Sequence, residues 1–148
     1  MKTHEQAVRA LMGGSSCAQA VLEALGEQYG IGSDLAKKLT AGFGGGFASG
    51  LTCGAVSGGC IALGLALGSS DTSDSYSRDR TYCAVQELLA RFAEKNHSHQ
   101  CSELLRLNGQ EMKTLEGKKK LRESRLCLKF VTDTIECIEQ IIKEEKAS

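Results

Sequence analysis

The sequence predicts an all-α fold, a single-domain helical bundle around a buried, glycine-rich central helix at about residues 52–68. Apolar residues recur at the spacing of one helix face in several segments, whereas no segment alternates apolar and polar residues between turn signals. The chain contains no proline, the residue that most strongly interrupts helices. A length of 148 residues supports one sizeable core, so we expect residues 1–148 to form one domain.

Three helices are expected before the glycine-rich segment. Residues 5–11 form a short amphipathic helix that Gly13–Gly14 end. Ser15–Ser16 are suitable N-caps for a second helix, which places Cys17 in its first turn. Ser33 is expected to cap a third helix, which continues through Leu35, Ala36 and Leu39 into the glycine-rich segment. The core-facing positions of the second helix are Cys17, Ala20, Val21, Ala24 and Leu25.

The segment between Lys38 and Asp71 carries no charged residue and has two parts. Residues 42–50 are dense in glycine and predict a loop with positive φ angles. Residues 52–68 are apolar or small on every side, which is typical of a buried helix. The length would also suit a membrane span, but the many glycines and the Ser and Thr residues disfavour insertion, so we expect no membrane span.

Beyond residue 70 the pattern predicts further helices. Residues 78–95 are amphipathic, residues 101–107 form a short helix, and residues 121–145 form the last helix, with Cys127 near its start. Residues 110–120 are highly charged and are expected to be an exposed connection. The apolar face of residues 78–95 is Tyr82, Val85, Leu88, Leu89 and Phe92.

Composition excludes several functions. Lysine and arginine balance aspartate and glutamate to a net charge of zero, which removes the general electrostatic argument for binding nucleic acid. No export signal is visible at the N-terminus, so we expect a cytoplasmic protein. Seven cysteines, an odd number, then indicate reduced, reactive or metal-bound thiols rather than a structural disulfide framework.

Two cysteines share a local design. Cys17 and Cys53 each follow a glycine-containing loop and a hydroxyl residue, and each begins a helix. Unpaired N–H groups and the helix dipole stabilise a negative charge there, so we expect a lowered pKa for both thiols. Cys101 is expected in a first helical turn as well, and Cys127 at a core-facing position within a helix.

The other candidate residues carry weaker signals. Cys60, Cys83 and Cys137 are expected to be packing or surface residues, and Cys83 points away from the apolar face of its helix. His97 and His99 could supply metal ligands beside Cys101, although a solvated loop is the simpler interpretation. No CxxC pair, nucleotide-binding loop or nucleophile elbow is present.

At this point the chain resembles a known family. The segments GGSSCAQAVLEAL and AGFGGGFASGLTCGAVSGG, a cysteine before Ser-Glu-Leu-Leu, and a cysteine opening the last helix are similar to the C_GCAxxG_C_C family of redox-active proteins. The resemblance assigns the family cysteines to Cys17, Cys53, Cys101 and Cys127. It implies a small helical domain of bacteria and archaea with a cysteine-based redox or metal site, often encoded near transporter genes. Related domains found with cytochromes suggest an iron–sulfur centre.

The resulting hypothesis is a redox protein with an unknown redox partner. Cys53 would be the nucleophile, held by the amides of Gly50, Gly54 and Ala55, and Cys17 its disulfide partner. Two forms of site remain open. In one, a thiol pair cycles with a disulfide; in the other, the four thiolates of Cys17, Cys53, Cys101 and Cys127 bind an iron–sulfur cluster or another metal. The alternatives are a non-enzymatic metal-binding or sensing protein associated with transport, and a structural helical module that could form a homo-oligomer.

Overall fold

The computed structural model describes residues 2–147, and within them it confirms the all-α prediction. No strand occurs in that range, only an isolated bridge between Thr52 and Gln100. No helix there is both long and apolar enough to cross a membrane. The helices are α1 (Lys2–Met12), α2 (Cys17–Gly26), η1 (Glu27–Tyr29), α3 (Ser33–Leu39), η2 (Gly46–Gly50), α4 (Gly54–Leu67), α5 (Ser75–Asn96), α6 (Cys101–Leu105), η3 (Glu111–Lys113), α7 (Leu115–Glu123) and α8 (Leu126–Ala147).

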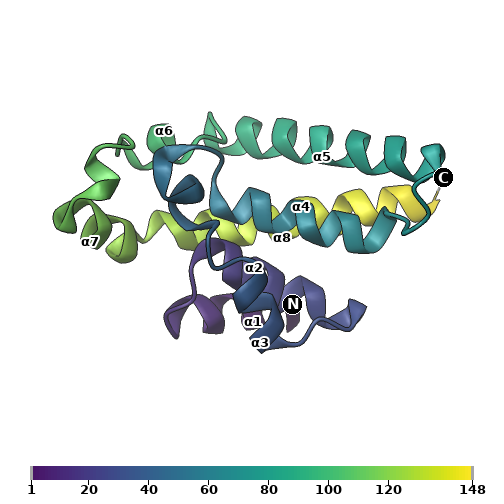
Figure 1. The fold of residues 1–148 in the computed structure, drawn as a ribbon, viewed down its shortest axis with the longest axis horizontal. Coiled ribbons are helices and arrows are strands. Elements are labelled where there is room, and N and C mark those ends of the chain that lie inside the picture. Colours follow the sequence, from purple (N-terminus) through teal and green to yellow (C-terminus); the bar gives the residue numbers. More distant parts are fainter. Residues whose placement is uncertain (1, 148) are drawn as a thin grey trace.

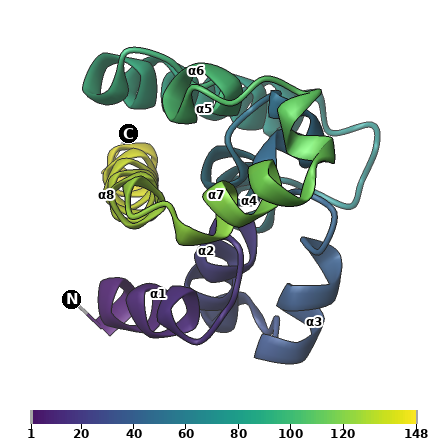
Figure 2. The ribbon, with the colours of Figure 1, turned by 90° about the vertical axis from the view of Figure 1, so that its left-hand side faces the viewer.

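Helix α4 lies at the centre of the bundle, as its composition predicts. It packs against α2 on one side and against α5 and α8 on the other, while α1 and α3 pack against α2 from outside (Figure 1). The end-on view shows α5, α8 and α1 along one side of the molecule, with α2 and α4 inside (Figure 2). Helices α6 and α7 and the starts of α4 and α8 lie together at one end, at the left of Figure 1.

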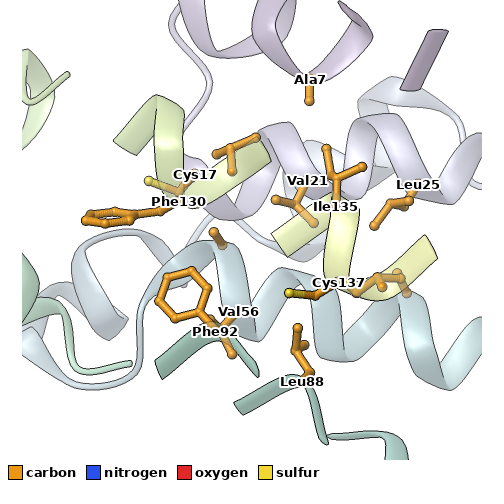
Figure 3. Packing of buried hydrophobic residues seen from close by; sticks show 14 of the residues in the cluster. Ala7, Cys17, Val21, Leu25, Val56, Leu88, Phe92, Phe130, Ile135 and Cys137 are labelled. Carbon is orange, nitrogen blue, oxygen red and sulfur yellow. The ribbon is translucent and has the colours of Figure 1, made fainter. Parts of the chain in front are cut away.

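Side chains from α2, α4, α5 and α8 fill one core (Figure 3). Phe92 of α5 meets Phe130 of α8 edge to face, with ring centroids 5.9 Å apart. Such aromatic pairs add about 0.5–1.5 kcal/mol to the stabilisation from burial alone. The largest fully buried apolar side chains are Phe92, Leu22, Leu25, Leu63, Leu88, Ile135, Ile138, Val21, Val56 and Val131.

The glycine-rich loop reaches left-handed conformations, as predicted, but not only at glycines. Gly45 and Gly46 have φ values of 66° and 63°, and Phe47 and Ala48 continue the run at 60° and 57°. A left-handed conformation costs a non-glycine residue about 1–2 kcal/mol. The turn folds back closely on itself, since a Cβ added to Gly46 would lie 2.5 Å from the backbone of Leu51.

Three details differ from the sequence prediction. Residues 110–120 are not an irregular connection, because Thr114 caps α7 through a hydrogen bond from the Gly117 N–H to its hydroxyl. The last helix begins at Leu126 instead of near residue 121, because α7 ends at Glu123. Tyr82 is 61% exposed, so it does not belong to the core-facing side of α5.

Candidate functional site

Cys17 is the first residue of α2, and a capping box fixes the start of that helix. The Ser16 hydroxyl accepts a hydrogen bond from the Gln19 backbone, and the Gln19 side chain accepts one from the Ser16 N–H at 2.9 Å. This reciprocal arrangement satisfies two of the N–H groups that a helix start leaves free. The Cys17 side chain is buried beneath the adjoining helices.

Cys53 and Cys101 are brought together by backbone pairing between distant segments. The Cys53 N–H donates to the His99 carbonyl at 2.7 Å, and the Cys101 N–H donates to the Leu51 carbonyl at 2.6 Å. Cys53 is the N-cap residue of α4 and Cys101 the first residue of α6. The pairing around the Thr52–Gln100 bridge therefore fixes the backbone at two cysteines that are 48 residues apart in the chain.

Cys127 also lies at a helix start, as predicted, and closer to it than expected because the last helix begins at Leu126 and not near residue 121. It is the second residue of α8, and the extended Ser124 hydrogen-bonds its sulfur through the hydroxyl. All four family-type cysteines thus lie at helix N-termini, where the dipole favours negative charge.

The four cysteines converge on one site. The Cys17 thiol is hydrogen-bonded to Cys127, and its pKa also responds to charge on Cys53 and Cys101. The pKa of Cys101 likewise responds to Cys53 and Cys127, and that of Cys53 to Cys127. Each thiol therefore lies within electrostatic reach of the other three, and all four side chains are buried.

The remaining cysteines lie elsewhere. Cys83 is exposed on α5, as predicted, and Cys137 is buried on α8 beside charged side chains that include Lys95. Cys60 is half-buried on α4 and lines an apolar groove with Phe43 and Phe47. None of these three thiols affects the pKa of the four clustered ones.

The pKa pattern within the cluster differs from the prediction. Burial raises the pKa of Cys53 to about 11, although N–H groups of Ala55 and Val56 donate to its sulfur and oppose the shift. The hydrogen bond to Cys127, together with burial, raises the pKa of Cys17. A lowered pKa at Cys17 and Cys53 is therefore a wrong prediction, because the hydrogen bond to Cys127 at Cys17 and desolvation at Cys53 outweigh the helix N-terminus.

The lowered pKa in the cluster belongs to Cys127. The Cys17 thiol donates a hydrogen bond to the Cys127 sulfur, and Ser124 and the Cys127 N–H add to the effect against the opposing effect of burial. Hydrogen bonds to the charged form of a group favour that form. Cys17 is thus the hydrogen-bond donor of the pair, and Cys127 is the sulfur on which negative charge is favoured.

A pocket of about 290 Å³ opens onto this pair. Cys17 and Cys127 both line it, whereas Cys53 and Cys101 do not. Arg122 is the one charged side chain among its lining residues, and it makes no ion pair within residues 2–147. Arg122 and Ser124 are the site residues that the sequence analysis missed, since their relevance depends on the break between α7 and α8.

His97, His99, Gly50 and Gly54 lie next to the cysteine cluster, and their surroundings are as follows. His99 accepts the Cys53 N–H through its carbonyl, and its Nδ1 atom is buried without a hydrogen-bond partner in the described residues. His97 is exposed in a left-handed conformation at the end of α5. A Cβ at Gly54 would lie 3.1 Å from the Phe43 carbonyl oxygen, and one at Gly50 3.0 Å from the Ser102 Cβ.

The four cysteines are a suitable set of metal ligands by type, but their side chains are not arranged around a metal position. Four cysteines are a common ligand set for zinc and for iron–sulfur clusters. Within residues 2–147, however, no three His, Cys, Asp or Glu side chains are arranged to hold a metal ion. The Cys17–Cys127 pair is joined by a sulfur hydrogen bond instead.

One comparison with known proteins found a match. A family model described as "Putative redox-active protein (C_GCAxxG_C_C)" matches residues 15–141, a range that contains Cys17, Cys53, Cys101 and Cys127. Searches of curated proteins and of solved structures gave no match. Since the model covers most of the chain, this protein belongs to the C_GCAxxG_C_C family of redox-active proteins.

Proposed function

We propose that this protein catalyses thiol–disulfide exchange, with Cys127 as the nucleophile and Cys17 as the resolving thiol. The observation that carries the proposal is the hydrogen bond from the Cys17 thiol to Cys127, two cysteines that line the same pocket. A thiolate is the attacking form of cysteine, and its access to the substrate limits the rate. Cys127 meets both requirements better than Cys53, whose pKa is raised to about 11 and whose side chain is 2% exposed.

The proposed reaction balances as a two-electron exchange. The Cys127 thiolate attacks one sulfur of a substrate disulfide, forms a mixed disulfide and releases the other half as a thiolate. Cys17 then loses its proton and attacks the Cys127 sulfur, which releases the second half. The Cys17 proton and one from water protonate the two released thiolates. The substrate disulfide is reduced to two thiols while Cys17 and Cys127 are oxidised to a disulfide, and an external dithiol completes the cycle in reverse.

The pocket suggests a small substrate. A volume of about 290 Å³ accommodates a low-molecular-weight disulfide or one exposed disulfide edge of a partner. Arg122, which makes no ion pair with another described residue, favours a substrate with a carboxylate or another anionic group near the disulfide. Ser124 remains hydrogen-bonded to the thiolate and positions it.

A test compares Cys127→Ser with the matched control Cys83→Ser. We expect Cys127→Ser to abolish reduction of hydroxyethyl disulfide by dithiothreitol through the protein, because the attacking sulfur is lost. Cys83→Ser should retain full activity, since Cys83 is exposed far from the cluster. In Cys17→Ser the mixed disulfide on Cys127 should accumulate and be detected by intact-mass spectrometry. Equal activities of the Cys127 and Cys83 variants would refute the assignment.

A Cys-ligated metal or iron–sulfur centre is the second candidate, and the convergence of four buried cysteines favours it. Metal and acid-labile sulfide analysis of protein purified without oxygen decides between the two. Stoichiometric iron and sulfide, lost together in variants of Cys17, Cys53, Cys101 and Cys127, would replace the thiol–disulfide proposal. A filled site that never changes oxidation state would instead indicate a metal-binding or sensing protein.

A further inference from the structure

We infer that the outward face of α7 is a docking surface for a partner protein whose disulfide lies in an acidic segment. We call this face the α7 surface, and its members are Leu115, Lys118, Lys119 and Arg122. The inference rests on the proposed function of Cys17 and Cys127, since it names the class of protein whose disulfide reaches their pocket. Helix α7 lies at the end of the bundle where α4 and α8 begin (Figure 1).

The buried residues of α7 lie on the side opposite to the α7 surface. Each member of that surface is three or four residues from two other members, so all four lie on one side of the helix. Gly117 is buried on the other side, where a Cβ would collide with the Glu111 carbonyl. Leu121 packs there against the small apolar cluster around Met112. The inner side therefore fixes α7 to the protein and leaves the α7 surface to solvent.

The α7 surface combines an exposed leucine with unpaired cations. Leu115 is 87% exposed, more than any other large apolar side chain in residues 2–147. Lys118 and Lys119 are exposed and make no ion pair with another described residue, whereas Lys120 on the flank pairs with Glu116 at 3.8 Å. An apolar side chain with charged neighbours resembles the apolar core and polar rim of a protein–protein interface.

Positive charge is concentrated in this part of the chain. Of the nine charged residues from position 113 to position 129, seven are lysine or arginine. The rest of the chain has 11 basic and 16 acidic residues, so the net charge of zero conceals an asymmetric distribution. A positive region on an otherwise acidic molecule attracts an acidic partner and orients it toward that region.

Arg122 connects the α7 surface to the pocket of Cys17 and Cys127. It is a member of that surface, and its side chain also lines the pocket. Lys118 and Lys119 lie about one helical turn earlier and do not line the pocket. A small disulfide held in the pocket therefore has no contact with these two lysines, whereas a protein segment that lies along α7 contacts them and reaches the pocket at Arg122.

An anionic membrane is another occupant that a basic helix could fit. A helix that binds in the membrane interface buries an apolar face in the lipid. In α7 the side with Gly117 and Leu121 is turned into the protein, and Leu115 is the one apolar member of the exposed side. The proposed reaction also requires a disulfide at the pocket, which a lipid does not supply. A protein partner is therefore the occupant that these observations favour.

The experiment uses two synthetic peptides, each closed by one disulfide, with dithiothreitol as the reductant. Aspartate and glutamate flank the disulfide in the acidic peptide, and asparagine and glutamine flank it in the neutral peptide. We expect the full chain to reduce the acidic peptide with the higher kcat/KM at low salt. Raising the NaCl concentration from about 0.05 M to about 0.5 M should largely remove this preference, because salt screens exposed charges.

A double substitution tests the two lysines directly. Lys118→Gln with Lys119→Gln should lower kcat/KM for the acidic peptide about five-fold at low salt, as expected for the loss of two exposed charge pairs. The kcat/KM for the neutral peptide should not change. The matched control, Lys143→Gln with Lys146→Gln, removes the same charge from the far end of α8 and should leave both values unchanged. All four lysines are exposed, so we expect both double variants to fold.

Equal kcat/KM values for the two peptides, or equal losses in the two double variants, would overturn the inference. Reduction of hydroxyethyl disulfide would then show that the proposed function still stands. If no disulfide is reduced, the proposed function fails, and the affinity for a labelled acidic peptide with serines in place of its cysteines tests docking alone. An affinity that falls in the Lys118/Lys119 variant supports the α7 surface, and an unchanged one overturns it. Binding to vesicles of phosphatidylcholine and phosphatidylglycerol, without preference for the acidic peptide, would overturn it in favour of a membrane.

Discussion

The close approach of α2 and α4 at Gly58 offers a test of how the cluster is positioned. A Cβ added to Gly58 would lie 2.8 Å from the carbonyl oxygen of Ala18 and 3.1 Å from its Cα. These are backbone atoms of α2, so the neighbour cannot move aside by changing a rotamer. Ala18 follows Cys17, and Gly58 lies in the helix that Cys53 caps. The spacing of the two helices therefore sets the spacing of the two thiols.

Gly58→Ala should destabilise the protein, whereas Gly64→Ala in the same helix should stabilise it. Both substitutions gain roughly 1 kcal/mol of helix propensity. In Gly58→Ala, overpacking against α2 lowers the free energy of unfolding by about 1–3 kcal/mol. Gly64→Ala has no such loss, because a Cβ at Gly64 meets nothing within 4 Å. For a chain of this size about 2 kcal/mol corresponds to roughly 4–8 °C in Tm. We expect the Gly58 variant to melt below the Gly64 variant by that amount.

The assay is thermal unfolding followed by far-ultraviolet circular dichroism in the presence of a reductant, with urea unfolding as a second measure. The reductant keeps the seven thiols free, so disulfides do not contribute to the difference. Equal melting temperatures for the two variants, or a higher one for Gly58→Ala, would refute the close helix approach.

Two further predictions concern the pocket and the buried thiols. Arg122→Gln should lower kcat/KM about ten-fold for the anionic disulfide 3,3′-dithiodipropionate, a loss within the range of one charged hydrogen bond. The kcat/KM for neutral hydroxyethyl disulfide should not change, and Arg125→Gln, at an exposed arginine, is the control. Equal losses for both disulfides would contradict an electrostatic role of Arg122. The free energy of unfolding, measured in urea, should decrease as the pH rises from about 9 to about 11. Over this range the thiols of the unfolded chain ionise, whereas Cys53 and Cys101 in the folded chain stay protonated. Cys53→Ala should flatten this decline, and a stability that rises over the same range would show that the sign is wrong.

Helix positions could be predicted where the local pattern was strong. The capping serine before Cys17, the apolar faces of α2 and α8 and the all-round apolar character of α4 depend on residues close together in sequence. Helix α7 was missed because most of its nine residues are charged, and such a segment has the same residue pattern as an exposed loop between helices. The Thr114 cap was visible, but a cap alone does not predict a helix without an apolar face.

The sequence by itself determined the all-α class, the buried central helix and the family to which the chain belongs. These properties follow from periodicity, glycine content and short motifs, all of which are local. Only the tertiary structure decided that Cys127 carries the lowered pKa and that Cys53 is buried away from the pocket. The physical reason is that desolvation and sulfur hydrogen bonds depend on neighbours up to 110 residues away, such as Cys17 beside Cys127. The position of a helix N-terminus can be predicted from local sequence. The pKa of a cysteine there depends on the balance between the helix dipole and burial, which tertiary packing sets.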